Sequence, residues 1–293
     1  MAFVLPTMFL GGCASSLPQI LQQSLSVVAP HKVDFIELEY YAKRSYAAYS
    51  PESAIVEQFP KTTRVRTIKS IDVLYFVETD RKLKQQTISV RGTANKPNFW
   101  QDVEARMVKD NVLGIYLHRG FRNDAMKVHK DIKQYIKKGY SIRVTGHSLG
   151  GGVAMILAGY LHKHGYDVER LVTFGQPKVT NEGGETFFTD GLTRVAHDDD
   201  VVPMLPPSTF QLLAGGRYEH MGPELILRSG PNYVYLPSHD ADRLSVGELW
   251  RNLTNFTTKQ HHMASYLDNI QGKIKNGSRQ VPYFGAPLFV AQQ

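Results

Sequence analysis

Residues 144–152 constrain this chain most, because they read VTGHSLGGG and place one serine between two glycines. The β-branched run at 141–145 predicts a strand before that serine, and the apolar run at 153–161 predicts a buried helix after it. A serine on such a tight turn needs a strained backbone, and flanking glycines let strand and helix approach closely. The pattern predicts a nucleophilic Ser148 and, in Leu149, a backbone amide for an oxyanion. The alternative is a glycine-rich turn with an idle serine.

Length and net charge limit the classes of protein to which this chain can belong. The chain has 293 residues, of which 42% are apolar, so we expect one large domain with a single core over residues 35–293. A net charge of +7 would attract anionic lipid headgroups or nucleic acid. Because the basic residues are scattered and form no known nucleic-acid-binding motif, we expect no nucleic-acid partner.

The single cysteine, Cys13, excludes an internal disulfide and any cysteine-based metal site. It ends an apolar stretch with the sequence Leu10-Gly11-Gly12-Cys13, which resembles a bacterial lipoprotein signal in which the cysteine thiol takes the lipid. This resemblance implies a signal peptide at 1–12, a tether at 13–34, and an outer-membrane lipoprotein of the bacterial cell envelope. An ordinary apolar N-terminal segment with a buried cysteine is the alternative.

Strand and helix patterns alternate along the remaining chain. Helical periodicity predicts helices over 35–49 and 121–138, the second ending at Gly139. Runs of β-formers predict adjacent strands over 64–77 and 84–90, joined around residues 79–80, and further strands at 170–174 and 192–196. This alternation predicts an α/β fold with an open, mostly parallel sheet.

Several motifs in one order make the chain resemble the class 3 lipases from about residue 37 to residue 267. The matching pieces are Val90-Arg91-Gly92-Thr93, Asn98-Phe99-Trp100-Gln101-Asp102, His118-Arg119-Gly120-Phe121, Thr145-Gly146-His147-Ser148-Leu149-Gly150-Gly151, Thr173-Phe174-Gly175-Gln176-Pro177, Asp200-Val201-Val202-Pro203 and Leu205-Pro206-Pro207. The resemblance implies an α/β-hydrolase fold, with a mostly parallel central sheet and helices on both faces. It also implies a catalytic triad in the chain order serine, aspartate, histidine.

Asp200 is the expected carboxylate of that triad, because it follows the predicted 192–196 strand and precedes the family's apolar-apolar-Pro segment. Asp198 and Asp199 are its rivals, in a run that also suits a solvated loop or a weak cation site.

Two adjacent histidines compete for the role of base. His261 lies five residues before Tyr266, the spacing of bacterial and plant relatives, whereas the shorter fungal spacing favours His262. We predict His261; His220 and His239 are lower candidates.

The resemblance also assigns an oxyanion hole and a lid. Thr93 and Leu149 would supply the backbone amides of the hole, and Asp102 would hold the Thr93 side chain. His147, next to the nucleophile, is given a supporting role. A turn residue and a helix cap are the alternatives for Thr93 and Asp102. Asn98, Phe99 and Trp100 match the lid of fungal members, although paired aromatics also commonly close a core.

The expected activity is hydrolysis of acyl-lipid esters, of lipase, phospholipase A or lysophospholipase type, through an acyl-enzyme. A catalytically silent envelope lipoprotein and a lipid acyltransferase are the alternatives. No EF-hand spacing or HExxH motif is present, and we expect neither a metal nor a cofactor. The expected partners are a lipid or ester substrate and a membrane, reached through the lipid anchor; the oligomeric state is left open.

Overall fold

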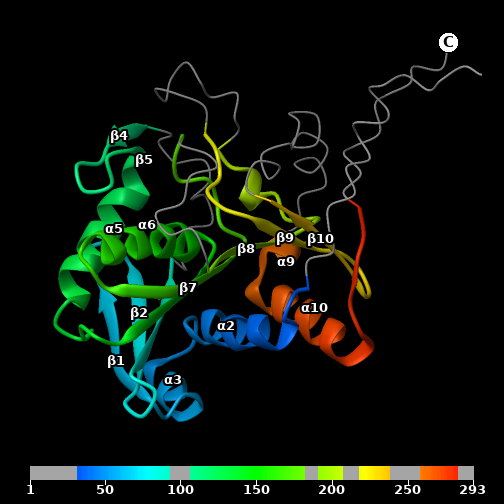
Figure 1. Ribbon diagram of the computed structural model, residues 1–293, viewed down its shortest axis with the longest axis horizontal. Coiled ribbons are helices and arrows are strands. Elements are labelled where there is room, and N and C mark those ends of the chain that lie inside the picture. Colours follow the sequence, from blue (N-terminus) through cyan, green and yellow to red (C-terminus); the bar gives the residue numbers. More distant parts are fainter. Residues whose placement is uncertain (1–31, 93–105, 182–190, 207–217, 238–257, 283–293) are drawn as a thin grey trace, which may run out of the picture.

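A mixed sheet of nine strands runs through the part of the chain that the computed structural model describes, residues 32–92, 106–181, 191–206, 218–237 and 258–282. The strand order is β1-β2-β3-β6-β7-β8-β9-β10-β11 (Figure 1). Strands β3, β6, β7, β8 and β9 are parallel, while β1, β2 and β10 pair antiparallel at the two sides. The strands are β1 (Thr62–Ile68), β2 (Val73–Asp80), β3 (Gln85–Arg91), β6 (Ser141–His147), β7 (Asp167–Phe174), β8 (Leu192–His197), β9 (Glu224–Leu227), β10 (Asn232–Leu236) and β11 (Arg279–Gln280), with a separate pair β4 (Met107–Lys109) and β5 (Tyr116–His118).

Helices cover both faces of this sheet. The helices are α2 (Phe35–Ala47), α3 (Glu52–Gln58), α5 (Arg119–Ile132), α6 (Leu149–Lys163), α9 (Thr258–His261) and α10 (Met263–Asn276), with a short 3-10 helix at Val202–Met204. On β7, Leu171 packs in one core with α5 and α6, whereas its neighbour Val172 packs in the other with α2 and α10. Successive strand residues point to opposite faces, so each face receives its own apolar row. The predicted fold class, a mostly parallel sheet between two helical layers, is confirmed.

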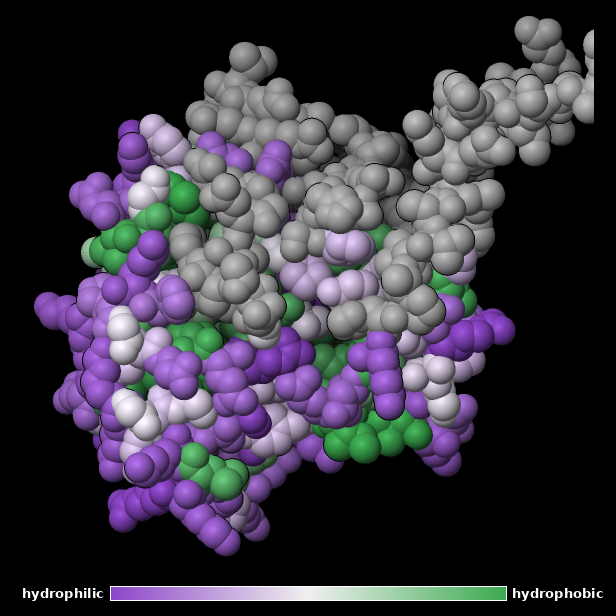
Figure 2. All heavy atoms as spheres, viewed as in Figure 1, coloured by the Kyte–Doolittle hydropathy of each residue, from purple (hydrophilic) through white to green (hydrophobic). Residues whose placement is uncertain are grey.

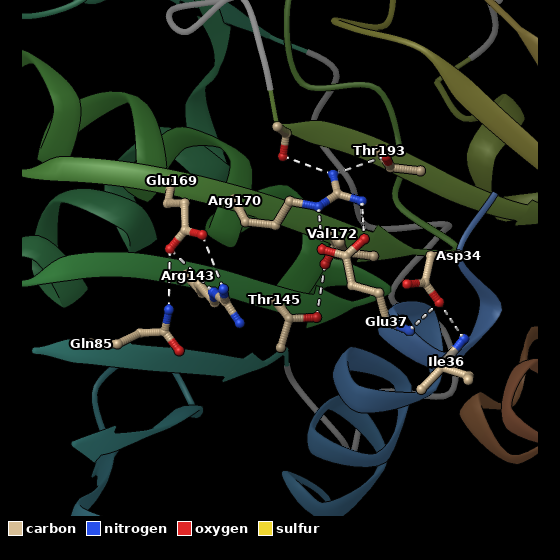
Figure 3. A network of polar contacts seen from close by, with 11 residues as sticks. Asp34, Ile36, Glu37, Gln85, Arg143, Thr145, Glu169, Arg170, Val172 and Thr193 are labelled. Atoms are coloured by element: carbon tan, nitrogen blue, oxygen red, sulfur yellow. Dashed lines mark hydrogen bonds and ion pairs between the residues drawn. The ribbon is translucent and has the colours of Figure 1, made fainter. Parts of the chain in front are cut away.

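Helix α2 begins where its sequence caps it. The Asp34 carboxylate accepts hydrogen bonds from the amides of Ile36 and Glu37, at 2.9 and 3.0 Å, which satisfies two donors of the first helical turn. Charged residues then attach the helix to the sheet. Arg170 of β7 binds both oxygens of Glu37 and also the hydroxyl of Thr193 in β8 (Figure 3). This network fixes the start of α2 over the centre of the sheet.

The sheet edge differs from the prediction at 64–77. Two antiparallel strands, β1 and β2, replace one continuous strand, and the connection to β3 follows Asp80. The chain reverses at residues 69–72, where Asp72 takes a φ of 50°. After Asp80, its carboxylate accepts from the amides of Lys82 and Leu83, which makes the next turn.

The predicted helix over 121–138 is also corrected. Helix α5 ends at Ile132, and Gly139, with a φ of +77°, lies in the turn before β6. The Gln86 side chain of β3 binds the carbonyl of Tyr135 and the amide of Lys137. These two backbone groups therefore find partners outside a helix, which sequence periodicity could not show.

Figure 2, viewed from the same side as Figure 1, shows hydrophilic side chains over most of the described surface, with apolar side chains in separate clusters. Across the described parts of the chain, no helix is both long and apolar enough to cross a bilayer. The predicted 1–12 and 13–34 segments and Cys13 lie outside the described residues.

A buried ion pair provides a test of the packing. Arg194 of β8 and Glu224 of β9 are 2% and 3% exposed at their side chains and lie 3.0 Å apart. Glu224→Gln leaves a buried guanidinium without its counter-charge, so we expect the free energy of unfolding to fall by about 3–5 kcal/mol in guanidinium titrations. The control is Glu169→Gln, which breaks the more exposed pair with Arg143 and costs about 0–1 kcal/mol. Equal losses would contradict this account.

Candidate active site

Ser148 lies on a strained turn between β6 and α6. Its backbone has φ 58° and ψ −129°, a conformation that a non-glycine residue adopts at a cost of about 1–3 kcal/mol. The Ser148 amide donates to the carbonyl of Phe174, at the end of β7, over 2.9 Å. The sheet thus holds the turn in place, and the side chain projects at the carboxyl ends of the parallel strands.

Glycines let the chain pack around this turn at backbone distance. A Cβ on Gly146 would lie 2.4 Å from the carbonyl oxygen of Gly150, and a Cβ on Gly150 would lie 2.3 Å from that of Val90. Neither contact is compatible with any side chain. The first turn of α6 therefore rests directly on the ends of β3 and β6.

Three side chains meet in one hydrogen-bonded row. The Ser148 hydroxyl donates to Nε2 of His261 over 2.8 Å, and Nδ1–H of His261 donates to Oδ2 of Asp200 over 2.8 Å. Asp200 follows β8, and His261 ends α9, 61 residues further along the chain. The structure thus brings together the three residues predicted as a triad; their catalytic roles stay a prediction.

The rival residues lie elsewhere. His262 is exposed and precedes α10 without capping it through its side chain, so His261 is the histidine at the serine. Asp199 is exposed, and His220 is buried with its Nε2 bound to the carbonyl of Pro203. His239 lies outside the described residues.

Asp200 is buried, with 2% of its surface exposed. Burial by itself would raise the pKa of the carboxyl, but the charge of His261 and hydrogen bonds from His261, Tyr266 and the amide of Val202 outweigh it and lower the pKa. The Tyr266 hydroxyl donates to Oδ2 over 2.6 Å and the Val202 amide donates to Oδ1 over 2.9 Å. The carboxylate is therefore anionic and fixed in direction, as a partner for an imidazolium must be.

Sequence reasoning missed three residues of this site. Tyr266 marks only a spacing after the two histidines, Tyr49 belongs to no motif, and Gly175 has no role that the sequence alone assigns. Gly175 has φ +53°, and a Cβ there would lie 2.9 Å from Oδ2 of Asp200 and 3.1 Å from Nδ1 of His261. Its place in the Thr173–Gln176 motif, right after a strand, was the available signal.

His147, the residue before the nucleophile, is buried behind His261. Its Nε2 lies 2.7 Å from the carbonyl oxygen of His261, and its Nδ1 lies 2.8 Å from the hydroxyl of Tyr49. Burial, followed by the charge of His261, lowers the pKa of His147 to about 3, so its imidazole is neutral at ordinary pH.

The start of α6 offers an anion site. Because the helix begins at Leu149, the amide of this residue has no partner within the helix, and the helix dipole favours negative charge there. The other predicted oxyanion and lid residues, Thr93, Asp102, Asn98, Phe99 and Trp100, lie outside the described residues.

Ligand-type side chains gather at His197, Asp198 and Asp199, with one ligand atom of each within 4.8 Å of the others. The Asn269 side-chain amide donates to Nε2 of His197, an orientation fixed because Lys273 takes the Asn269 oxygen. The proton of the imidazole is therefore on Nδ1, the nitrogen that faces Asp198 at 3.3 Å. That nitrogen has no lone pair for a metal.

Known lipases match this chain over part of its length. A family model described as Lipase (class 3) matches residues 87–210, which include Ser148 and Asp200 but not His261. Secreted mono- and diacylglycerol lipase 1 of Fusarium solani is 36% identical over 166 residues, 53% of this chain and 48% of that protein. A lipase of Rhizomucor miehei is 28% identical over 196 residues, 61% of this chain and 51% of that protein. The chain thus spans about half the length of the curated relatives it matches.

Solved structures share the fold. The Rhizomucor miehei lipase in its propeptide complex superposes with a TM-score of 0.54 and 25% identity, covering 66% of this chain and 68% of that one. Lipase II from Rhizopus niveus gives 0.54 at 22% identity, covering 67% and 81%.

Gly175 provides a test of the site. Gly175→Ala imposes strain through its positive φ and also pushes a methyl group against Asp200 and His261, so we expect ester hydrolysis to fall at least about tenfold per folded molecule. Gly139→Ala is the matched control, since its φ is +77° but no atom lies within 4 Å of the added Cβ. Both variants lose about 1–2 kcal/mol of stability. Full activity in Gly175→Ala would show that the contact is harmless.

Proposed function

We propose, from the premise that this chain belongs to the class 3 lipase family, that it hydrolyses carboxylic esters of acyl lipids with Ser148 as nucleophile. One observation carries the proposal: a serine on a strained turn donates to a histidine that is held by a buried carboxylate. Such a row activates a hydroxyl that is otherwise a weak nucleophile.

The first half of the reaction forms an acyl-enzyme. Oγ of Ser148 attacks the ester carbonyl carbon while Nε2 of His261 takes the hydroxyl proton, and Asp200 stabilises the resulting imidazolium. The tetrahedral intermediate collapses, the bond to the leaving alcohol breaks, and His261 returns the proton to that alcohol. Water then repeats the sequence, which releases the fatty acid and restores the serine.

Negative charge on the carbonyl oxygen is stabilised by backbone donors. The Leu149 amide, at the start of α6, is one of them, and we retain Thr93 with its partner Asp102 as the second. Removing a single oxyanion donor typically costs about 3–4 kcal/mol of transition-state stabilisation. Phe99 and Trp100 are proposed to meet lipid as part of a lid, in which case rates rise above the concentration at which the substrate aggregates.

The substrate class we propose is membrane-derived acyl lipid, including glycerides and phospholipids. The similarity to a mono- and diacylglycerol lipase of Fusarium solani supports glycerides. The net charge of +7 supports an approach to anionic lipid surfaces.

We also propose that Cys13 carries a lipid that attaches the protein to the bacterial outer membrane. The sequence Leu10-Gly11-Gly12-Cys13 supports this location. If so, Cys13→Ser moves the protein from the membrane fraction to the soluble fraction, as immunoblots of fractionated cells would show. Unchanged fractionation would overturn the anchor without affecting the hydrolase proposal.

Ser148→Ala tests the activity. A fluorophosphonate probe labels the wild-type protein covalently but not this variant, and hydrolysis of defined glycerides and phospholipids falls at least about 10³-fold, because the nucleophile is removed. The products of the wild-type reaction identify the head group and the ester bond that is cut. Absence of labelling in a folded wild type would mean a silent hydrolase fold, and transfer of the acyl group to added alcohol in preference to water would mean an acyltransferase.

A further inference from the structure

Behind the triad, the His147 side chain contacts the backbone of His261, and the Tyr49 side chain contacts His147 in turn. Nε2 of His147 lies 2.7 Å from the carbonyl oxygen of His261, and the hydroxyl of Tyr49 lies 2.8 Å from Nδ1 of His147. The two imidazoles also face each other, with ring centroids 4.8 Å apart and an interplanar angle of 33°. His147 is 4% exposed, so these contacts are made away from water.

The chemistry of the groups assigns every proton in this arrangement. A carbonyl oxygen only accepts, so Nε2 of His147 carries the proton and donates it to His261. Nδ1 of the neutral ring then has a lone pair, and the Tyr49 hydroxyl donates to it. The carbonyl of His261 therefore selects the Nε2–H tautomer of His147, and the Tyr49 hydroxyl satisfies the remaining ring nitrogen.

Tyr49 is itself fixed to the strand that carries the nucleophile. The turn after α2 is closed by hydrogen bonds from the amides of Tyr49 and Ser50 to Tyr46 and Ala47. Four residues earlier, the Ser45 hydroxyl binds that of Thr145 on β6, over 2.9 Å. Residues 45 and 49 of the helical segment thus meet residues 145 and 147, which share one face of the strand.

We propose that Tyr49 and His147, the Tyr49–His147 bridge, are positioning residues that hold the His261 imidazole at the serine. The inference rests on the proposed hydrolase function. The adjacent residues His147 and Ser148 both contact His261. Ser148 binds its imidazole ring, and His147 binds its backbone carbonyl. A displacement of about 1 Å between reacting groups costs roughly 10² in rate, so a backbone anchor next to the nucleophile has a large effect on turnover.

The experiment separates turnover from substrate binding. For Tyr49→Phe we expect kcat on a short-chain p-nitrophenyl ester to fall about fivefold to tenfold with KM within a factor of two, because Nδ1 of the buried His147 ring loses its donor and the ring is held less firmly. Tyr49 is 39% exposed, so this variant retains its fold. For His147→Leu, which removes the anchor itself, we expect kcat to fall about 10²-fold.

Matched variants distinguish positioning from packing. Tyr46→Phe, in the last turn of α2 three residues before Tyr49, removes a hydroxyl that makes no hydrogen bond to the described residues, and leaves kcat unchanged; the Tyr46 side chain is 45% exposed. His147→Gln places an amide nitrogen as many bonds from Cβ as Nε2 of histidine, so it restores the donor and recovers at least about tenfold over His147→Leu. If His147→Gln is no better than His147→Leu, or Tyr49→Phe keeps wild-type kcat, the proposal is wrong.

A readout that needs no turnover keeps this inference separate from the proposed function. In the wild-type protein with ¹⁵N-labelled histidine, NMR shows His147 as the neutral Nε2–H tautomer and a downfield proton for the His261 Nδ1–H bond to Asp200. Tyr49→Phe and His147→Leu shift or broaden that proton, whereas Tyr46→Phe does not. An Nδ1–H tautomer for His147 overturns the bridge, whereas failure of the wild type to react with fluorophosphonate overturns only the proposed function.

Discussion

The structure depends on one strained residue, Ser148, whose positive φ bends the chain from β6 into α6. Such a conformation persists only where its surroundings over-determine it. Here the carbonyl of Phe174 accepts from the Ser148 amide, and the first turn of α6 rests on the ends of β3 and β6 through the backbone of Gly146 and Gly150. The two helical layers bury the sheet around that point. These contacts compensate for the strain at Ser148. The bend directs the Ser148 hydroxyl away from strand β6.

Around that hydroxyl, a buried anion organises the other groups. Asp200 is out of water, and an unpaired carboxylate there would be strongly unfavourable. Donors from His261, Tyr266 and Val202 compensate for the lost solvent and also fix the direction of the carboxylate. Tyr266 further accepts from the amide of His197, so the hydroxyl that orients Asp200 is itself held by β8. The polar groups form a connected set in which each member limits the movement of the next.

The class 3 lipase family model covers only part of this arrangement. The matched segment at 87–210 contains the strained turn and Asp200, whereas His261 and Tyr266 lie beyond it. In the structure, Asp200 and Ser148 contact the ring of His261, and His147 contacts its backbone carbonyl. The histidine before the nucleophile has a partner at each ring nitrogen, the Tyr49 hydroxyl on one side and that carbonyl on the other.

Local patterns were enough to predict the parallel core of the fold and the serine on the tight turn, because apolar periodicity and glycine placement are local properties of the chain. They did not determine where the first edge strand breaks or where α5 ends, because Asp72 and Gln86 act there through a backbone reversal and a distant side chain. Which of two neighbouring histidines meets Ser148 was likewise decided only by tertiary structure. The two residues are both histidines, so only the directions of their side chains distinguish them. The direction of the His261 side chain is set by Asp200 and Ser148, which are 61 and 113 residues away in the sequence.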